Sequence, residues 1–227
     1  SEAQLDAAGA LAREFPDCLI ETHLSENRAE IALTLSLFPQ ARDYTDVYDR
    51  FGLLTKSTLL GHCIHLSARE RARIVEAGAV AVHCPTSNLF LGSGLFDAAA
   101  ARAAGMRTAL ATDVGAGTSY SMLATLGEAY KVRLLQGQTL TPLEGFHQIT
   151  RGNALALGLG EAVGSFAVGR EADFVMLDAR ATPAMAHRME RARSLDDELF
   201  VLMTMGDDRA VAATYVMGEK AVMGGSS

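Results

Sequence analysis

The feature that most constrains this chain is a repeated alternation of short apolar segments with segments of helical periodicity. Such alternation predicts a parallel β-sheet whose strands are joined by helices. Three of the apolar segments run directly into a residue that can bind a metal or transfer a proton, namely His23, His62 and Asp113. Because side chains at the carboxyl ends of parallel strands converge, the pattern predicts hydrolytic chemistry at the mouth of a parallel α/β barrel.

Composition limits the ligands that such a site would take. The 227 residues are 49% hydrophobic, which suffices for a large core in one domain or in part of a larger one. The net charge of −7 and the lack of clustered Lys and Arg argue against nucleic-acid binding. A small, neutral or weakly charged ligand is the simpler expectation.

Cysteine usage and hydropathy indicate the cellular setting. Three cysteines without a CxxC spacing favour neither a disulfide framework nor a zinc finger, and they indicate a reducing, cytoplasmic environment. No apolar run reaches the roughly 18 residues of a membrane span, and the first residues lack the pattern of a signal peptide. We therefore expect a soluble protein without a membrane partner.

Capping residues and glycines mark the boundaries of the predicted elements. Ser67 and Glu70 form a capping box that predicts a helix start, and Gly78 predicts its end. We predict two domains, a β/α domain over residues 1–160 and a small β domain over residues 161–227. The predicted elements are helices at 2–14, 68–77, 95–104, 119–136 and 142–157, a helix from about residue 25, strands at 18–22, 58–62, 79–83, 106–112, 174–177 and 211–217, a turn at 85–88 and a surface excursion at 179–197.

Four residues at predicted strand ends are candidates for the site: His23, His62, His83 and Asp113. A single histidine at a strand end is more often a hydrogen-bonded structural residue than a ligand. Four such residues in successive β/α units are harder to explain structurally. Asp113 follows an apolar strand directly, where burial of a carboxylate is costly unless a cation or hydrogen bonds compensate.

Glu26 follows His23 by three residues, so that one turn of chain can present a metal ligand and an acid to the same substrate. A structural explanation is equally compatible with the sequence. In that explanation Ser25 caps the next helix and Glu26 is a first-turn carboxylate. Both descriptions can hold together.

The remaining histidines and the cysteines near the strand ends carry less weight. His65 either orients its neighbour His62 or faces solvent, and we favour solvent. His147 and His187 fall in a helix and in the charged excursion, where structural or solvated roles are the default. Cys63 and Cys84 follow strand-end histidines, but strand alternation turns neighbouring side chains to opposite faces, which predicts packing roles.

With these residues in place, the chain resembles the amidohydrolase superfamily and, within it, the guanine deaminases. Metal-dependent deaminases share most of the matching motifs widely. The Ser-Glu-Asn sequence after His23 and the Asp-Tyr-Thr-Asp-Val-Tyr segment are what favour guanine. The matching segments are residues 22–27, 43–48, 61–66, 83–88, 112–123 and 164–174.

The resemblance implies a (β/α)8 TIM-type barrel with a small composite β-sandwich. It assigns this chain to about strands five to eight of the barrel and part of the sandwich. It also implies one zinc ion per site, held by His23 and Asp113 together with a His-x-His pair that this sequence does not contain. Whether His62 ligates the metal or only contacts its water is left open, and zinc is favoured over iron or manganese only by the resemblance.

The implied reaction is hydrolytic deamination of guanine to xanthine and ammonia in purine catabolism. Zinc would acidify a water, Asp113 would accept its proton, Glu26 would pass a proton to the ring nitrogen and the leaving amine, and His62 would steady the developing charge. The resemblance thus makes Glu26, His62 and Asp113 catalytic. It also implies that the purine is contacted by His23, Leu24, Ser25, Glu26 and Asp113.

Two alternatives remain open at this point. The substrate could be another aminated heterocycle, such as an adenosine derivative or an s-triazine, or the chain could be an inactive fragment. Four barrel strands alone would leave two open edges and an exposed apolar interior. We therefore expect completion by a complementing N-terminal segment or within a homodimer.

Overall fold

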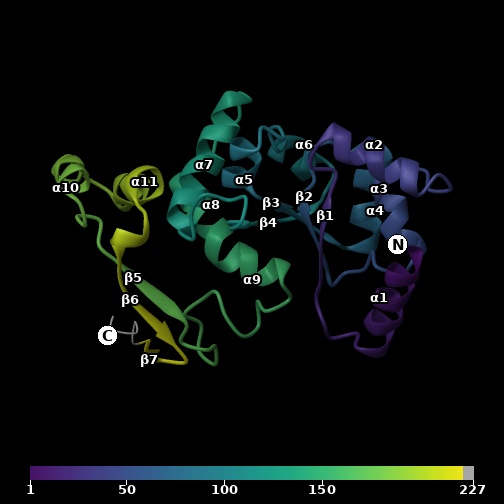
Figure 1. Cartoon of the computed structure of the whole chain (residues 1–227). Helices are drawn as coiled ribbons and strands as arrows, with labels where there is room; N and C mark the ends of the chain where they lie inside the picture. Colours follow the sequence, from purple (N-terminus) through teal and green to yellow (C-terminus); the bar gives the residue numbers. More distant parts are fainter. Residues whose placement is uncertain (222–227) are drawn as a thin grey trace, which may run out of the picture. The chain divides into compact units, whose positions relative to one another are not determined.

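Figure 1 shows the computed structural model, which describes residues 1–221 of the chain. The described chain forms two compact units, one spanning Ser1–Thr118 and the other beginning at Ser119. The first contains a parallel sheet with its helices, and the second contains helices and a small antiparallel sheet. The predicted domain boundary at residues 160 and 161 stays a prediction, because a compact unit and a family domain need not share their limits.

A four-stranded parallel sheet organises the first unit. Its strands lie side by side in sequence order, and each neighbouring pair is parallel. The carboxyl ends of the strands therefore lie at one end of the sheet, which confirms the predicted α/β class. The strands are β1 (Ile20–Leu24), β2 (Thr58–His62), β3 (Val80–His83) and β4 (Arg107–Leu110).

Helices fill the connections, because parallel neighbours need a crossover that returns the chain to the opposite end of the sheet. Helix α1 (Glu2–Glu14) precedes β1. The connections contain α2 (Arg28–Leu37) and α3 (Tyr44–Arg50), then α4 (Ala68–Ala77), and finally α5 (Pro85–Phe90) and α6 (Ala98–Ala103). The turn predicted over residues 85–88 is wrong, because Pro85 occupies the first turn of α5, where its missing amide hydrogen costs nothing.

Apolar side chains from strands and helices fix the sheet. Leu24 and Leu60 on neighbouring strands and Ile74 on α4 have no exposed surface and belong to one core cluster. Burying each such side chain contributes roughly 1.5–3 kcal/mol. The core therefore holds the ends of β1 and β2 in a defined position, which matters for the polar residues that follow them.

The predicted limits of α4 are confirmed. The Ser67 hydroxyl accepts a hydrogen bond from the Glu70 amide, and the Glu70 carboxylate accepts one from the Ser67 amide. Gly78 ends the helix with φ of 71°, a conformation that glycine adopts without steric cost.

The start of α2 differs from its predicted position. Asn27, and not Ser25, is the N-cap, and its side chain accepts a hydrogen bond from the Glu30 amide at 2.9 Å. Asn binds a free amide of the first turn as well as Ser does. Glu26 consequently lies before the helix, in the turn that follows β1, rather than in the first helical turn.

The second unit contains helices followed by a three-stranded antiparallel sheet in the order β5-β6-β7. Strand β5 has the predicted limits, and β6 ends one residue before the predicted end. Helix α8 continues through a π-helical segment into α9, so the predicted end near residue 157 is confirmed. The elements are α7 (Met122–Leu135), α8 (Pro142–His147), η1 (Gln148–Gly152), α9 (Asn153–Ala156), β5 (Phe174–Leu177), α10 (Pro183–Met189), α11 (Leu195–Met205), η2 (Asp208–Ala210), β6 (Val211–Val216) and β7 (Glu219–Lys220).

The surface excursion predicted over residues 179–197 is wrong. Thr182 caps α10 and Pro183 occupies its first position, which is a normal helix start. Met185 and Met189, four residues apart, are buried in the core cluster of the second unit. The charges of this segment obscured an apolar helical face.

Helix length is the last property of the fold that bears on function. The longest described helix, α7, has 14 residues, whereas a helix that crosses a bilayer needs about 20 apolar residues. Within residues 1–221, every helix is too short or too polar for such a crossing.

Candidate metal centre

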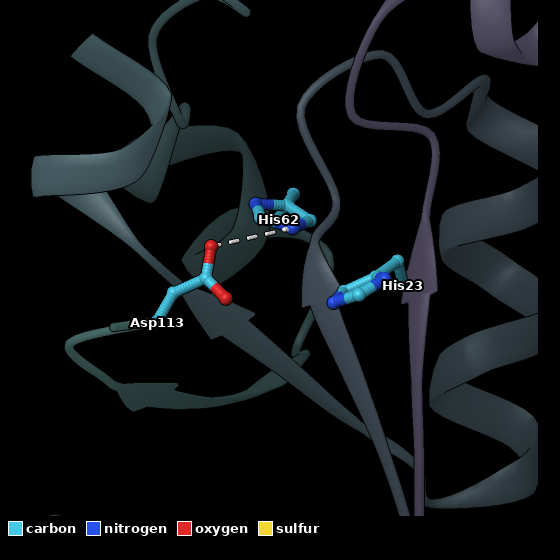
Figure 2. Close-up of side chains that lie close together, drawn as sticks. All are labelled: His23, His62 and Asp113. Atoms are coloured by element: carbon cyan, nitrogen blue, oxygen red, sulfur yellow. Dashed lines mark ion pairs between the residues drawn. The ribbon is translucent and has the colours of Figure 1, made fainter. Parts of the chain in front are cut away.

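Three side chains that can bind a metal converge at the carboxyl end of the parallel sheet. They are His23 near the end of β1, His62 at the end of β2, and Asp113 just after β4. One ligand atom from each lies within 4.8 Å of the others. Figure 2 shows the two imidazole rings and the carboxylate directed toward a common space. Two imidazoles and a carboxylate are donors that suit Zn²⁺ and related transition metals.

Glu26 joins this group from the turn after β1. The Nε2 atom of His62 lies 3.8 Å from a carboxylate oxygen of Glu26 and 3.8 Å from one of Asp113. The rings of His23 and His62 are 5.2 Å apart between centroids. His62 is thus central, with a carboxylate on each side and the second imidazole beside it.

The register of the sheet explains why His23 fits here. His23 pairs with Gly61 on the neighbouring strand. A Cβ atom at position 61 would lie 3.3 Å from Cδ2 of His23, which is closer than most real contacts of this kind. The glycine therefore leaves room for the His23 ring beside β2.

Unusual backbone conformations mark the same place. In the described chain, five residues other than glycine have a positive φ, and four of them are Ser25, His62, Cys63 and Asp113, with φ between 50° and 71°. Such conformations cost of order 1–3 kcal/mol each and persist where surrounding structure enforces them. Their concentration near the strand ends supports a functional role for the carboxyl end of the sheet.

The loop after Asp113 is fixed by a glycine and a threonine. The Gly117 amide donates to the Asp113 carbonyl, and a Cβ atom at position 117 would lie 1.8 Å from the Thr112 carbonyl oxygen. The Thr86 hydroxyl donates to that same Thr112 carbonyl at 3.1 Å. Gly117 is therefore required for the turn that holds the Asp113 backbone.

His62 is held by a buried amide. Asn88 is 1% exposed, and its Nδ2 atom lies 2.9 Å from Nδ1 of His62. This contact fixes the ring so that Nε2 faces Glu26 and Asp113. Burial lowers the pKa of His62 below its ordinary value of 6.5, and nearby His23 acts in the same direction, while Glu26 and Asp113 oppose the shift.

This lowered pKa predicts how stability depends on pH in the metal-free protein. A group whose pKa is lower in the folded state stabilises the fold above its unfolded pKa, and that stability is lost as the pH falls through the folded pKa. We expect the melting temperature of the wild type to fall more steeply between about pH 7 and pH 5 than that of His62→Gln. Calorimetry of both proteins at several pH values measures the slopes, and equal slopes would contradict the assignment.

The other predicted candidates lie elsewhere. His83 is buried and stacks on Phe96, with ring centroids 4.8 Å apart, and it is not a member of the metal-competent group found among residues 1–221. His65 was expected to face solvent, which is wrong, because it is partly buried and its Nε2 atom lies 2.9 Å from the Ser93 carbonyl oxygen. His147 is exposed, and His187 is exposed and pairs with Glu190.

Leu24 and Ser25 were predicted to contact the substrate with their neighbours. The Leu24 side chain lies instead in the core cluster and has no exposed surface. Ser25 is 1% exposed, and its carbonyl accepts hydrogen bonds from the amides of Ile64 and His65. Its hydroxyl has no protein partner in the described structure. Both substrate contacts stay predictions.

The two cysteines after the strand-end histidines are packing residues in the structure. Cys63 and Cys84 are 5% and 4% exposed. Burial raises the pKa of the Cys63 thiol and raises the pKa of the Cys84 thiol to about 12. Both thiols therefore stay protonated near neutral pH, in the form that does not bind metals.

Three polar residues support this group, and none of these roles was predicted from the sequence. Thr86, Asn88 and Ser93 all come from the segment after β3, and each donates to a residue at or near the site. Thr86 and Asn88 fall in the segment 83–88 that resembles the family, but no supporting role was predicted for them, and Ser93 lies outside every matching segment. Their partners lie 26 to 67 residues away in the sequence, so that no local pattern identifies them.

Comparison with known proteins decides the family. The family model described as "Amidohydrolase family" matches residues 1–221. The chain belongs to the amidohydrolase family. This amidohydrolase is similar to the guanine deaminase of Escherichia coli, with 46% identity over 218 residues that make up 96% of this chain and 50% of the relative. The resemblance drawn from the motifs is therefore confirmed.

Solved structures agree with this comparison. The structure of E. coli guanine deaminase superposes on this amidohydrolase with a TM-score of 0.96 and 45% identity, covering 98% of this chain and 52% of the other. Guanine deaminase from C. acetobutylicum, with guanine bound in its active site, superposes with a TM-score of 0.88 and 30% identity, covering 98% of this chain and 52% of the other. An adenosine deaminase from Xanthomonas campestris with bound zinc superposes with a TM-score of 0.84 and 25% identity, covering 97% of this chain and 48% of the other. The chain spans about half the length of these relatives.

Proposed function

We propose that this amidohydrolase takes part in the hydrolytic deamination of guanine to xanthine and ammonia. The observation that carries the proposal is the convergence of His23, His62 and Asp113, with Glu26 at 3.8 Å from His62. The similarity to guanine deaminases over nearly the whole chain supports the choice of guanine. The relative from C. acetobutylicum, in which guanine occupies the active site, supports it further.

We propose zinc as the metal and His23 and Asp113 as its ligands in this chain. Imidazole nitrogen and carboxylate oxygen fit zinc, and the adenosine deaminase from X. campestris contains zinc. When bound, zinc supplies a water of lowered pKa. His62 lies beside this position, with Nε2 facing both carboxylates.

The chain's own carboxylates and His62 then move protons and stabilise charge. Asp113 accepts a proton from the attacking water, whose oxygen forms a bond to C2 of guanine. Glu26 gives its proton to the ring nitrogen, takes up the proton of the new C2 hydroxyl and passes it to the amine, so that the C2–N bond breaks, a C2 carbonyl forms and ammonia leaves. The water proton held by Asp113 then returns Glu26 to its acid form. His62 donates to the oxygen on which negative charge develops, because its Nε2 faces the space between the two carboxylates.

We further propose that the four strands correspond to about strands five to eight of a (β/α)8 barrel. In the described sheet, β1 and β4 are the edge strands, each hydrogen-bonded on one side only. Such edges are normally closed by further strands. A complementing N-terminal segment would supply them together with the remaining metal ligands, whereas a second copy of the chain would supply strands but no His-x-His pair.

The test is ammonia release from guanine by the purified protein after loading with zinc, with and without a chain that supplies the complementing half. We expect ammonia and xanthine in equal amounts, and zinc that survives dialysis and raises the melting temperature. If zinc neither binds nor raises the melting temperature and no ammonia appears in either preparation, the proposal fails and the chain is an inactive fragment.

A second candidate keeps the metal and changes the substrate. The adenosine deaminase from X. campestris matches the fold at a TM-score of 0.84 with 25% identity, so an adenosine derivative is a specific competitor. The same ammonia assay with adenosine, adenine and an s-triazine separates the candidates. Faster turnover of any of these than of guanine would replace guanine as the substrate.

A further inference from the structure

The Glu26 carboxylate accepts a hydrogen bond from a side chain that has no part in the proposed reaction. The Ser93 hydroxyl donates to the Oε1 atom of Glu26 at 2.8 Å. The two residues are 67 positions apart in the sequence, and they come from the turn after β1 and the segment between α5 and α6. A polar contact between such distant segments at a candidate site needs an explanation beyond local turn formation.

We propose that Ser93 is a positioning residue for Glu26: its hydroxyl holds the carboxylate so that one oxygen is reserved for the proton that the reaction moves. The proposal rests on the proposed deaminase function, in which Glu26 is the proton carrier. Ser93 itself acts through Glu26 and touches neither substrate nor metal.

The two oxygens of Glu26 have different surroundings. Oε1 accepts from the Ser93 hydroxyl, whereas Oε2 lies 3.8 Å from Nε2 of His62. A hydroxyl that donates to Oε1 favours the acceptor state of that oxygen, so the proton of a protonated Glu26 sits on Oε2. That oxygen faces the space shared by His62 and Asp113, where a substrate would lie.

Ser93 is held firmly enough to serve this purpose. Its amide donates to the Asn88 carbonyl at 2.9 Å, and its carbonyl oxygen lies 2.9 Å from Nε2 of His65. The His65 amide donates in turn to the Ser25 carbonyl at 3.0 Å. His65 therefore ties the Ser93 segment to the residue directly before Glu26, and both ends of the Ser93–Glu26 contact share one support.

Close packing next to Ser93 restricts the segment further. Gly94 has φ of 135°, and a Cβ atom there would lie 2.9 Å from Cγ2 of Ile64. Only glycine meets both conditions. Ser93 is 8% exposed, so its hydroxyl does not exchange freely between Glu26 and bulk water. The contact is thus preorganised, as a positioning role requires.

A purely structural role is the competing explanation, and it predicts a different result. A structural hydrogen bond supports stability, whereas a positioning bond supports the rate of proton transfer. The matched control is Ser67→Ala, because Ser67 caps α4 through its hydroxyl, which accepts a hydrogen bond from the Glu70 amide in that helix. It removes a structural hydroxyl hydrogen bond from the same unit.

The experiment compares Ser93→Ala with Ser67→Ala in the zinc-loaded, completed protein. For Ser93→Ala we expect kcat for guanine to fall about tenfold with KM changed less than about twofold, as loss of one hydrogen bond to a reacting group predicts. For Ser67→Ala we expect a lower melting temperature and an unchanged kcat. A kcat within about twofold of the wild type in Ser93→Ala would overturn the proposal.

A double-mutant comparison tests whether Ser93 acts through Glu26. If it does, adding Ser93→Ala to Glu26→Gln leaves the residual kcat unchanged, because the group being positioned is already gone. A further tenfold loss in the double variant would show an independent role and overturn the proposal.

A measurement without turnover separates this inference from the proposed function. Crystal structures of the wild type and of Ser93→Ala show whether the Glu26 carboxylate keeps one orientation. We expect a single orientation in the wild type and a rotated or split carboxylate in the variant. If the wild type releases no ammonia, the proposed function fails, whereas an unchanged carboxylate in Ser93→Ala makes the positioning role fail.

Discussion

Replacing Asp113 by asparagine is expected to lower kcat/KM for ammonia release from guanine by at least about a thousandfold. Asparagine has the size of aspartate, but its amide neither accepts a proton from water nor offers an anionic oxygen to a cation. Asp113 lies in the group whose ligand atoms are within 4.8 Å of one another. The substitution therefore removes a base and weakens a metal ligand in one step.

Zinc binding gives a second, independent result for the same variant. A ligand that binds only the folded protein raises the melting temperature in proportion to its binding free energy. We expect zinc to raise the melting temperature of Asp113→Asn by less than that of the wild type, and the retained zinc after dialysis to fall. Calorimetry and metal analysis on the same preparations measure both quantities.

The control for this prediction is Asp6→Asn, on the exposed surface of α1. It makes the same chemical change in the same compact unit and should leave activity and zinc binding at the wild-type level. Activity of Asp113→Asn within about tenfold of the wild type would exclude Asp113 as the base, because loss of such a group costs about 10²-fold or more.

Local sequence signals predicted the scaffold that holds Asp113. The apolar segments ending at His62 and preceding Asp113 form β2 and β4, and the Ser67 and Gly78 signals delimit α4. These features depend on periodicity within a few residues and on capping chemistry, which the sequence contains directly. That is why the carboxyl end of the sheet could be predicted, and with it the convergence of His23, His62 and Asp113.

Among the helices that were not predicted, α5 and α10 lie in segments where a competing signal favoured a turn or a solvated surface. Pro85 and the polar residues after it favoured a turn, yet proline also begins helices, and α5 starts there. Charged residues around Met185 and Met189 suggested a solvated surface, although the two methionines form a buried helical face. The competing signals have the same local strength, and tertiary packing decides between them.

The supporting hydrogen bonds could not be predicted at all. Asn88 meets His62 across 26 residues, and Ser93 meets Glu26 across 67. Serine and asparagine are common in loops, and nothing in the sequence indicates which loop residue faces which strand end. Only the folded arrangement after β3 brings these groups to the candidate site.

Replacing Glu26 by glutamine is expected to lower kcat by about 10²-fold to 10⁴-fold while zinc binding stays at the wild-type level. Glutamine keeps the shape of the side chain but cannot carry the proton between the ring nitrogen and the leaving amine. Glu26 is outside the metal-competent group of the described residues, although it lies 3.8 Å from His62. Its loss should therefore affect proton transfer without affecting the metal.

Comparing Glu26→Gln with Asp113→Asn distinguishes loss of proton transfer from loss of metal binding. Both variants lose activity, but only Asp113→Asn should lose zinc-dependent thermal stability. Glu14→Gln, at the exposed end of α1, is the matched control for glutamate and should behave as the wild type. If Glu26→Gln also failed to bind zinc, Glu26 would be a ligand rather than a proton carrier, and the role proposed for Ser93 would have no basis.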